Sequence, residues 1–273
     1  MVLKKLMKRM ITEENCKVYL LRKYNMNNLY EYLTKEYNAK FSGWDFSYVK
    51  GRMIEDKLSW NYKDIVEKNI IGKESLLDMG TGGGEFLCSL SNLPKNVYAT
   101  EGYEPNIPIA EKRLKEKNIL LKQINNDSEI PFDNEYFDIV INRQESYEIK
   151  ELKRILKKGG LFITQQVGGL NGIDFNMAFE TKTTDYIEWC LIKNIEMFKN
   201  AGMEIVEFEE NIGKMKFNDI GAIVYYLKCI PWQVKDFSID KYYKKLEIMN
   251  EIIEKNGFMN FVLHRFYMII RKL

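Results

Sequence analysis

Histidine is scarce in this chain, and its cysteines are not paired. A single His, His264, stands among 273 residues, which argues against a histidine-rich metal site. The four cysteines, Cys16, Cys88, Cys190 and Cys229, are scattered and form no CxxC pair. Neither a disulfide framework nor a zinc site is suggested, so no metal is expected and a reducing cytoplasm is the expected compartment.

Long apolar runs are also absent. No run approaches the roughly 18–20 residues needed to cross a bilayer, so no stable membrane insertion is expected. The composition is not that of a disordered chain, because 45% of the residues are hydrophobic and 13% are aromatic, beside 29% charged. A length of 273 residues is enough for one large α/β domain with additions.

A strong net charge is missing, but the charge is unevenly spread. The formal net charge is +2, and residues 1–25 hold seven basic and two acidic residues (+5), which leaves −3 for residues 26–273. The slightly acidic remainder argues against a broad nucleic-acid surface. The basic start, with Leu3, Leu6 and Met10 at helical spacing, fits a membrane or RNA anchor. We favour the simpler interpretation, a solvated helix or a dispensable extension.

Strands and helices alternate from residue 75 onward. Strands are predicted at 75–79, 96–100, 119–123, 137–142 and 160–166, with helical segments at 85–93, 105–117 and 146–157 between them. This alternation predicts βαβ units and a doubly wound, mostly parallel α/β sheet. A ligand is then expected at the carboxyl ends of the strands.

The two ends of the chain do not continue this alternation of strands and helices. Residues 1–69 are predicted to be a mostly helical N-terminal extension with a loop around Gly43 and Gly51, and residues 70–273 the main domain. The later segments are predicted as helix at 174–201, strand at 203–210, helix at 217–230 and 239–255, and a last strand at 258–270. Residues 211–257 are thus an insertion between two late strands, rich in Tyr and Trp.

The clearest local signal is the glycine-rich turn Asp78-Met-Gly-Thr-Gly-Gly-Gly84, which follows a strand and opens a helix. Glycines let the backbone turn sharply and approach a ligand, and the following helix presents free N–H groups. Dinucleotide enzymes use G-x-G-x-x-G, but here the third residue after Gly82 is Glu85, whose carboxylate would face a pyrophosphate. The pattern favours a nucleoside that carries an amino acid, with Asp78 near its ammonium group.

An acid follows the second strand of the sheet. Glu101 stands 17 residues beyond Gly84, where a carboxylate can accept hydrogen bonds from both hydroxyls of a ribose. A carboxylate at this position is compatible with either class of adenosine cofactor, so Glu101 does not discriminate between them.

Four blocks of sequence together resemble the class I S-adenosylmethionine-dependent methyltransferases. They are residues 76–84, residues 99–101 with Ala110, residues 130–132 with 137–142, and residues 151–161. The resemblance covers about residues 70–170, and it implies a Rossmann-like, seven-stranded sheet whose last strand is antiparallel.

The resemblance also implies a set of cofactor-binding residues. The methionine part of S-adenosylmethionine is assigned to Asp78, Gly80, Thr81, Gly82 and Gly84. Glu101 would bind the ribose, and Asp127 would approach the adenine amino group. Because the spacing from Asp127 to Phe132 is one residue shorter than usual, Asn126 could share that role.

The acceptor is expected beyond the strand 137–142, because methyl transfer is an in-line displacement that needs alignment and shielding from water. Asn142 ends this strand and is counted with the cofactor-binding residues. Glu145 is a candidate base or orienting carboxylate, or an acid that a helix N-terminus favours. Arg143 binds an acidic acceptor or pairs with Glu145. The (Asn/Asp)-Pro-Pro-aromatic turn of adenine-amino methyltransferases is absent.

The C-terminal part adds three candidates. Tyr226 and Trp232 belong to an aromatic helix that ends at Pro231, which fits a lid over the acceptor or plain packing on the sheet. His264 is a second candidate base, although a lone His among apolar neighbours is more often a hydrogen-bonded structural residue.

These patterns predict a cytoplasmic, S-adenosylmethionine-dependent methyltransferase that acts on a small molecule. One alternative is an rRNA or tRNA base methyltransferase that grips RNA through the basic N-terminus. The others are an NAD(P)-dependent oxidoreductase and a protein that senses the cofactor without turnover.

Overall fold

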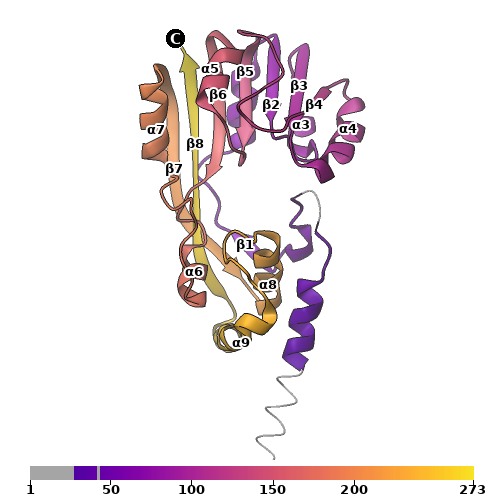
Figure 1. The fold of residues 1–273 in the computed structure, drawn as a ribbon, viewed down its shortest axis with the longest axis vertical. Helices are drawn as coiled ribbons and strands as arrows, with labels where there is room; N and C mark the ends of the chain where they lie inside the picture. Colours follow the sequence, from indigo (N-terminus) through magenta and orange to yellow (C-terminus); the bar gives the residue numbers. More distant parts are fainter. Residues whose placement is uncertain (1–27, 42–43) are drawn as a thin grey trace, which may run out of the picture.

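An eight-stranded sheet runs through the part of the chain that the computed structural model describes, residues 28–41 and 44–273 (Figure 1). Its strands in chain order are β1 (Met53–Glu55), β2 (Ser75–Met79), β3 (Asn96–Glu101), β4 (Leu120–Gln123), β5 (Phe137–Arg143), β6 (Leu156–Val167), β7 (Met203–Phe217) and β8 (Met259–Lys272). Their order in the sheet is β1-β7-β8-β6-β5-β2-β3-β4. The basic segment 1–25 lies outside the described residues, and so does Cys16.

The strand pairing confirms the predicted doubly wound α/β class. Strands β4, β3, β2, β5 and β6 pair in parallel, and β8 returns antiparallel against β6. The expected number of strands was seven, and the eighth is β1, which pairs Met53 with Phe217 of β7. A three-residue strand is too short to show a period in sequence, so the segment around it was predicted as loop and helix.

Helices cover both faces of the parallel part. One face carries α2 (Tyr62–Ile70), α3 (Glu85–Ser89) and α4 (Ile107–Lys115), and the other carries α5 (Ile149–Ile155) and α7 (Leu191–Asn200). Each face has its own set of buried side chains, because both faces of a parallel sheet are apolar. A short 3-10 helix, η2 (Glu104–Asn106), stands between β3 and α4, whereas a second, η1 (Ser47–Val49), precedes β1 and contributes Val49 to another core.

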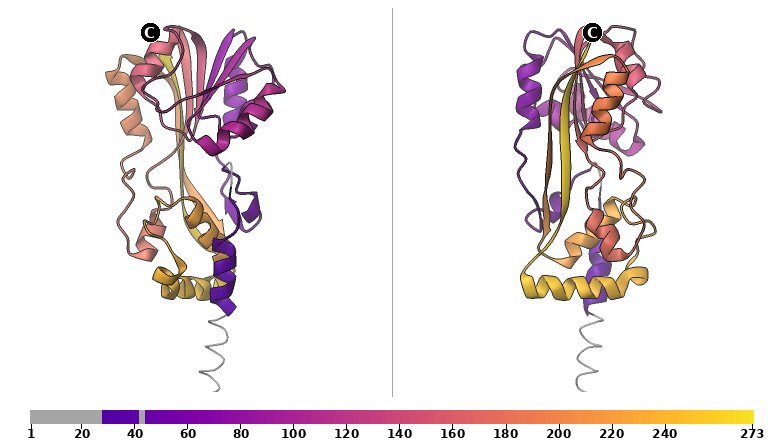
Figure 2. Two further views of the ribbon diagram at one scale, coloured as in Figure 1. Left: turned by 45° about the vertical axis from the view of Figure 1, so that its right-hand side comes forward. Right: turned by 90° about the vertical axis from the view of Figure 1, so that its left-hand side faces the viewer.

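A third core lies beyond the parallel strands. β7 and β8, of 15 and 14 residues, are the longest strands of the described sheet, and they run from the main sheet into this third core, as two further views show (Figure 2). It is formed by the helical stretch 28–37, α6 (Ile173–Phe179), α8 (Ile220–Cys229) and α9 (Ile239–Asn256) packed on the ends of these two strands. We call residues 28–37, α6, α8 and α9 the helical unit.

Local signals explain the ends of these helices. Asp219 precedes α8 and accepts a hydrogen bond from the Ala222 N–H (2.8 Å), and Gly257 ends α9 with a φ of +82°. The helix predicted over 174–201 is wrong in its middle, because Glu180 takes a left-handed φ of +53° and ends α6. β7 runs on to Phe217, so the segment between β7 and β8 begins at residue 218 instead of 211.

Polar contacts hold the helical unit together. The Arg52 guanidinium donates to the Asp219 carboxylate (2.6 and 2.8 Å) and to Glu36 (3.0 Å). It thereby joins the stretch 28–37 to the start of α8. Among the residues that the structure describes, no helix is long and apolar enough to cross a membrane.

Candidate active site

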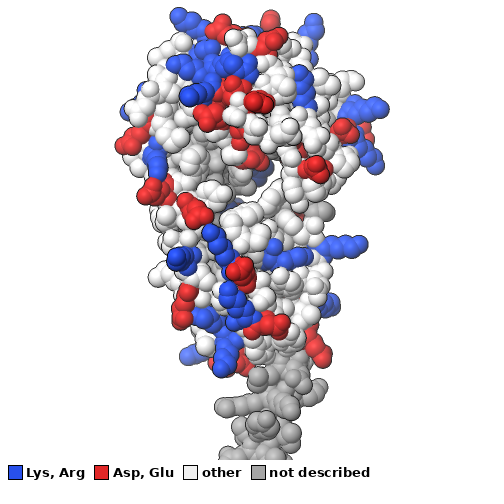
Figure 3. All heavy atoms as spheres, in the orientation of Figure 1, with Lys and Arg blue, Asp and Glu red and all other residues white. Residues whose placement is uncertain are grey.

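The carboxyl ends of the parallel strands lie on the side of the sheet that faces the helical unit (Figure 1). The molecular surface is hollowed between these two parts, and acidic side chains gather on the sheet side of the hollow (Figure 3). In a doubly wound sheet this edge is where a ligand is expected.

The glycine-rich turn at the end of β2 has the predicted form. Gly80, Gly82 and Gly84 have φ values of +66°, +61° and +81°, in the left-handed region that favours glycine. Thr81 fixes the turn, because its N–H donates to the Thr100 carbonyl (2.9 Å) and its hydroxyl to the Asp78 carboxylate (2.8 Å). Gly84 then begins α3.

Glu101 lies against this turn. Its buried carboxylate accepts hydrogen bonds from the N–H groups of Gly82 and Tyr103, both at 2.7 Å. A Cβ atom on Gly82 would meet no other atom within 4 Å, so the turn leaves open space on this side of Gly82. Each carboxylate oxygen keeps a lone pair for a further donor such as a hydroxyl.

Asp78 is a buried acid with little to neutralise it. Its side chain is 3% exposed. Burial raises its pKa to about 7; Thr81 and Arg143 oppose the shift and Glu101 adds to it. A buried carboxylate with so few compensating groups is suited to bind a cation.

Glu145 and Asp127 meet at the same turn. The Glu145 side chain lies across Gly80, at the place that a Cβ atom of residue 80 would take. Glu145 accepts a hydrogen bond from the Ser146 N–H (3.0 Å), while the Ser146 hydroxyl donates to Asp127. Loss of hydration and the nearby Asp127 and Glu101 charges raise the pKa of Glu145, although hydrogen bonds from Ser146 oppose this. Across the described ranges, no group of three or more His, Cys, Asp or Glu residues is placed to hold a metal ion.

The two asparagines predicted to bind the cofactor have partners within the protein. Asn142 is fully buried, and its side-chain oxygen accepts hydrogen bonds from the Thr164 hydroxyl (3.0 Å) and the Gln166 amide (2.7 Å). Asn126 accepts a hydrogen bond from the Ser128 N–H (3.0 Å) in a local turn. The structure therefore places Asn142 at the site as a support for the end of β5.

Arg143 lies at the end of β5 with an aromatic partner. Its guanidinium is 5.2 Å from the ring centroid of Phe86, a distance at which a cation is attracted to the ring. Within the described part of the chain, no ion pair joins Arg143 to Glu145.

The structure places Tyr226 and Trp232 in the helical unit. Tyr226 is buried among Phe175 and Phe217, at ring-centroid distances of 5.9 and 5.5 Å, and burial raises its pKa. Trp232 is 44% exposed, and its ring centroid is 5.7 Å from that of Trp44. Of the two, Trp232 therefore has the surface available for a ligand.

His264 is buried in β8 with both ring nitrogens engaged. Its Nδ1 accepts a hydrogen bond from the Leu170 N–H (3.3 Å), and its Nε2 lies 3.0 Å from a Glu210 carboxylate oxygen. This arrangement fixes the tautomer with the proton on Nε2. It leaves no ring nitrogen for a substrate.

Two residues that sequence reasoning missed brace the strand ends. The Tyr62 hydroxyl lies 2.9 Å from the carbonyl oxygens of both Asn142 and Ile163, and it can donate to one of them at a time. The Trp60 indole N–H donates to the Gln165 side chain (2.8 Å). No spacing in the sequence points to either residue, because these contacts arise only when α2 packs on the sheet.

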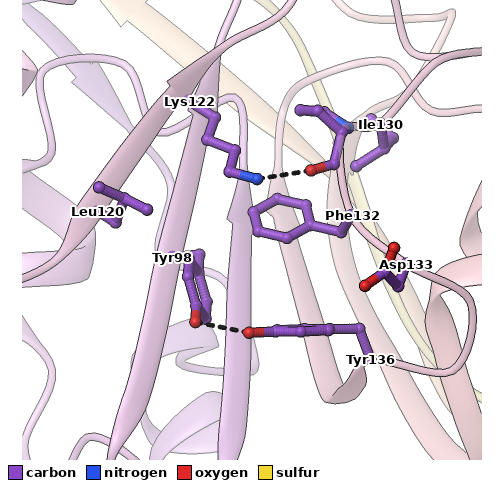
Figure 4. Close-up of a pocket in the computed structure, with 8 residues that line it drawn as sticks. Tyr98, Leu120, Lys122, Ile130, Phe132, Asp133 and Tyr136 are labelled. Atoms are coloured by element: carbon purple, nitrogen blue, oxygen red, sulfur yellow. Dashed lines mark hydrogen bonds between the residues drawn. The ribbon is translucent and has the colours of Figure 1, made fainter.

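A groove of about 550 Å³ lies away from the strand ends, over one face of β3 and β4 (Figure 4). It forms because residues 124–136 contain no helix to cover this face. In the close-up the hydroxyls of Tyr98 and Tyr136 face one another (2.7 Å), and Lys122 donates to the Pro131 carbonyl (2.6 Å). None of the predicted site residues lines this groove.

Comparisons with known proteins match part of the chain to one family. A family model described as a methyltransferase domain matches residues 77–164. No curated protein matches the chain.

Solved structures with the same fold share little sequence with the chain. BH2331 from Bacillus halodurans C-125, named as a candidate methyltransferase, superposes with a TM-score of 0.56 at 18% identity, over 78% of this chain and 98% of its own. The YcgJ protein from Bacillus subtilis gives 0.55 at 15% identity, over 77% and 97%. A protein of unknown function from Deinococcus radiodurans R1 gives 0.55 at 10%, over 81% and 91%. Residues 77–164 thus match a methyltransferase-domain model, and the chain shares the fold of these solved structures.

Proposed function

We propose that this chain transfers a methyl group from S-adenosylmethionine to a small-molecule acceptor. One observation carries the proposal: the glycine turn after β2 is joined to the buried Glu101 carboxylate, at 2.7 Å from the Gly82 N–H, with open space on one side of Gly82. This arrangement lies at the carboxyl end of the strands, within the segment that matches the methyltransferase domain.

The residues at the turn suit this cofactor. Asp78 would bind the ammonium of its methionine part, which would relieve the cost of burying an uncompensated carboxylate. Glu101 would accept the ribose hydroxyls, and Asp127 the adenine amino group. Gly80, Thr81, Gly82 and Gly84 would let the backbone approach the ligand. The bound cofactor supplies an electrophilic methyl group on a sulfonium.

The same acids favour a small acceptor over RNA. A nucleic-acid partner is held mainly by basic groups that neutralise its phosphates. The strand ends instead carry Asp78, Glu101, Asp127 and Glu145 close together, so a polyanion would be repelled there. The rRNA or tRNA base methyltransferase is therefore the less favoured function.

The segments outside the glycine turn would help to build the site and to cover the acceptor. Residues 70–273 make up the methyltransferase domain, residues 1–69 extend it, and the helices after β7 serve as a lid that offers Trp232 to the acceptor. Glu145 is the carboxylate that faces the acceptor. The engaged ring of His264 favours a structural role for that residue, so catalysis does not depend on it.

Cofactor binding tests the proposal directly. Isothermal titration calorimetry with S-adenosylhomocysteine should show binding to the wild-type chain. The affinity of Glu101→Gln should be at least tenfold lower, because the amide has one oxygen in place of two and cannot accept a hydrogen bond from each ribose hydroxyl on a separate oxygen. Glu104→Gln removes the same charge from an exposed neighbour and should bind normally. A wild-type chain that binds NADH and leaves S-adenosylhomocysteine unbound would contradict the proposal.

A further inference from the structure

Four carboxylates surround the glycine turn, and three of them have a partner in the proposed cofactor. These three are Asp78, Glu101 and Asp127, assigned above to the ammonium, the ribose and the adenine amino group. Glu145 is the fourth, and the cofactor offers it no hydroxyl or amino group.

The position of Glu145 is fixed from two sides. The Gln166 amide donates to the Glu145 carbonyl (3.0 Å) and also to the Asn142 side chain (2.7 Å), so the loop after β5 is tied to β6. The side chain itself lies across Gly80. Glu145 thus stands beyond the end of β5 and beside the methionine end of the predicted cofactor site, where an acceptor must enter for in-line transfer.

Within the described residues, no lysine, arginine or histidine forms an ion pair with Glu145. Arg143, two residues away, lies against the Phe86 ring and acts on the charge of Asp78. The Asp127 carboxylate shares the Ser146 hydroxyl with Glu145, and its charge acts on Glu145. An anionic acceptor would be repelled here, whereas an ammonium group would be attracted, because like charges at close range are costly and opposite charges are favourable.

The surroundings of Glu145 also suit it to accept a proton. Loss of hydration and the nearby Asp127 and Glu101 charges raise its pKa, so its carboxylate is a stronger base than an ordinary glutamate. This matters for one acceptor class above others. An amine that arrives as an ammonium ion must lose a proton before its nitrogen can attack a methyl group.

We infer that the acceptor is an amine, and that Glu145 binds its ammonium form and removes the proton that blocks the nitrogen lone pair. The inference rests on the proposed function. An N–H bond breaks as its proton passes to the Glu145 carboxylate, and the N–H electron pair stays on nitrogen. The nitrogen lone pair then forms the N–C bond, and the electron pair of the broken C–S bond returns to sulfur. The products are an N-methylated ammonium ion and a neutral thioether.

A binding experiment tests the inference without any acceptor. Sinefungin resembles S-adenosylmethionine but carries a primary amine at the position of the sulfonium methyl, whereas S-adenosylhomocysteine has no cation there. Calorimetry at about pH 7.5, near physiological pH, should show that the wild-type chain binds sinefungin at least tenfold more tightly than S-adenosylhomocysteine. Glu145→Gln should lose this preference and still bind S-adenosylhomocysteine normally, which also shows that it is folded.

A matched variant separates local contact from general charge. Glu129→Gln removes one negative charge from an exposed position on the loop after β4, and it should keep the full preference for sinefungin. The inference would be overturned if Glu145→Gln kept the preference for sinefungin, or if Glu129→Gln lost as much of it as Glu145→Gln. Neither result would contradict the proposed methyl transfer. Failure of both nucleosides to bind the wild-type chain would instead overturn the proposed function.

Transfer of a labelled methyl group gives an independent answer. The wild-type chain is incubated with methyl-labelled S-adenosylmethionine and a small-metabolite extract, and the products are separated by ion exchange at neutral pH. The inference expects label in the fraction held by the cation exchanger. Label confined to neutral or anionic fractions would overturn it, and label in no fraction would count against the proposed function itself.

Discussion

Asp78 shows, at the scale of one residue, how burial of a carboxylate at the proposed binding site lowers the stability of the fold. Burial raises its pKa to about 7, from 3.8 for an ordinary aspartate. The folded state therefore holds the proton more tightly than the unfolded state, and this residue's contribution to stability falls as the pH rises from about 4 to about 7. We predict that Asp78→Asn raises the free energy of unfolding at pH 8, by at most about 4 kcal/mol at ~1.4 kcal/mol per pH unit, and raises it much less at pH 4.

The same substitution should weaken cofactor binding, because the amide carries no charge for the ammonium of the methionine part. Urea unfolding at the two pH values and calorimetry with S-adenosylhomocysteine measure the two effects. Asp138→Asn is the control: hydrogen bonds from Lys157 and Ser75 lower the pKa of Asp138 despite its burial, so that variant should lose stability at pH 8 and bind normally. Equal stability of Asp78→Asn and wild type at pH 8 would contradict the account.

Single residues of the site were predictable where covalent spacing alone decides their place. The Gly80–Gly84 turn and Glu101 follow adjacent parallel strands, and the carboxyl ends of such strands must meet at one edge. Asn142 and His264 were not predictable to the same degree, because their hydrogen-bond partners come from distant strands and loops. A sequence shows that a side chain is polar, but it does not show what that side chain will bind.

At the scale of the element, α2 is attached to the sheet by more than its apolar face. The buried Tyr62 hydroxyl lies 2.9 Å from two carbonyl oxygens, that of Asn142 near the end of β5 and that of Ile163 within β6. We predict that Tyr62→Phe lowers the free energy of unfolding by about 1–3 kcal/mol, since it leaves buried polar groups without their donor. Urea unfolding followed by circular dichroism measures the change.

The chain offers a matched control for this loss. Tyr98 donates to or accepts from the Tyr136 hydroxyl at the partly open groove (2.7 Å), where water can replace the lost partner. Tyr98→Phe should therefore cost less than about 0.5 kcal/mol, in the range of surface substitutions. Similar losses in the two variants would show that the Tyr62 hydroxyl has no special part in joining α2 to the strand ends.

Elements with a continuous apolar pattern were predictable, and elements whose bounds depend on distant contacts or on a single backbone angle were not. The strand period is clear over 137–142 and 258–270, which became β5 and β8, because their inward residues are apolar along their whole length. β1 has three residues and owes its conformation to the neighbouring β7. The break between α6 and α7 likewise depends on a left-handed residue, Glu180, that no helical period reveals.

At the scale of the whole molecule, β7 and β8 couple the parallel sheet to the helical unit. Buried residues of β8 contribute to all three cores, Phe261 to the helical unit, and Phe266 and Tyr267 to the two faces of the sheet. The sequence predicted an insertion with aromatic residues here, but it did not reveal a separate core, because that core combines residues 28–37 with helices about 200 positions later in the chain.

Arg52 is where this coupling can be tested, because it joins the two distant stretches of the helical unit. Its guanidinium binds Asp219 and the Glu36 carboxylate, whose side chain is only 7% exposed. We predict that Arg52→Met lowers the free energy of unfolding by about 2–4 kcal/mol, because it leaves a buried carboxylate without its cation. Arg271→Met breaks an exposed pair with Glu204, at 41% and 43% side-chain exposure, and should cost at most about 1 kcal/mol.

The manner of unfolding distinguishes a coupled molecule from two independent parts. If the shared strands transmit the loss, Arg52→Met should unfold in one transition at lower urea, with tryptophan fluorescence and circular dichroism changing together. Trp44 and Trp232 report on the surface of the helical unit, while Trp60 reports on the strand ends, where it contacts Gln165. An early fluorescence change that leaves S-adenosylhomocysteine binding intact would contradict this coupling, since the helical unit would then melt while the strand ends stayed folded.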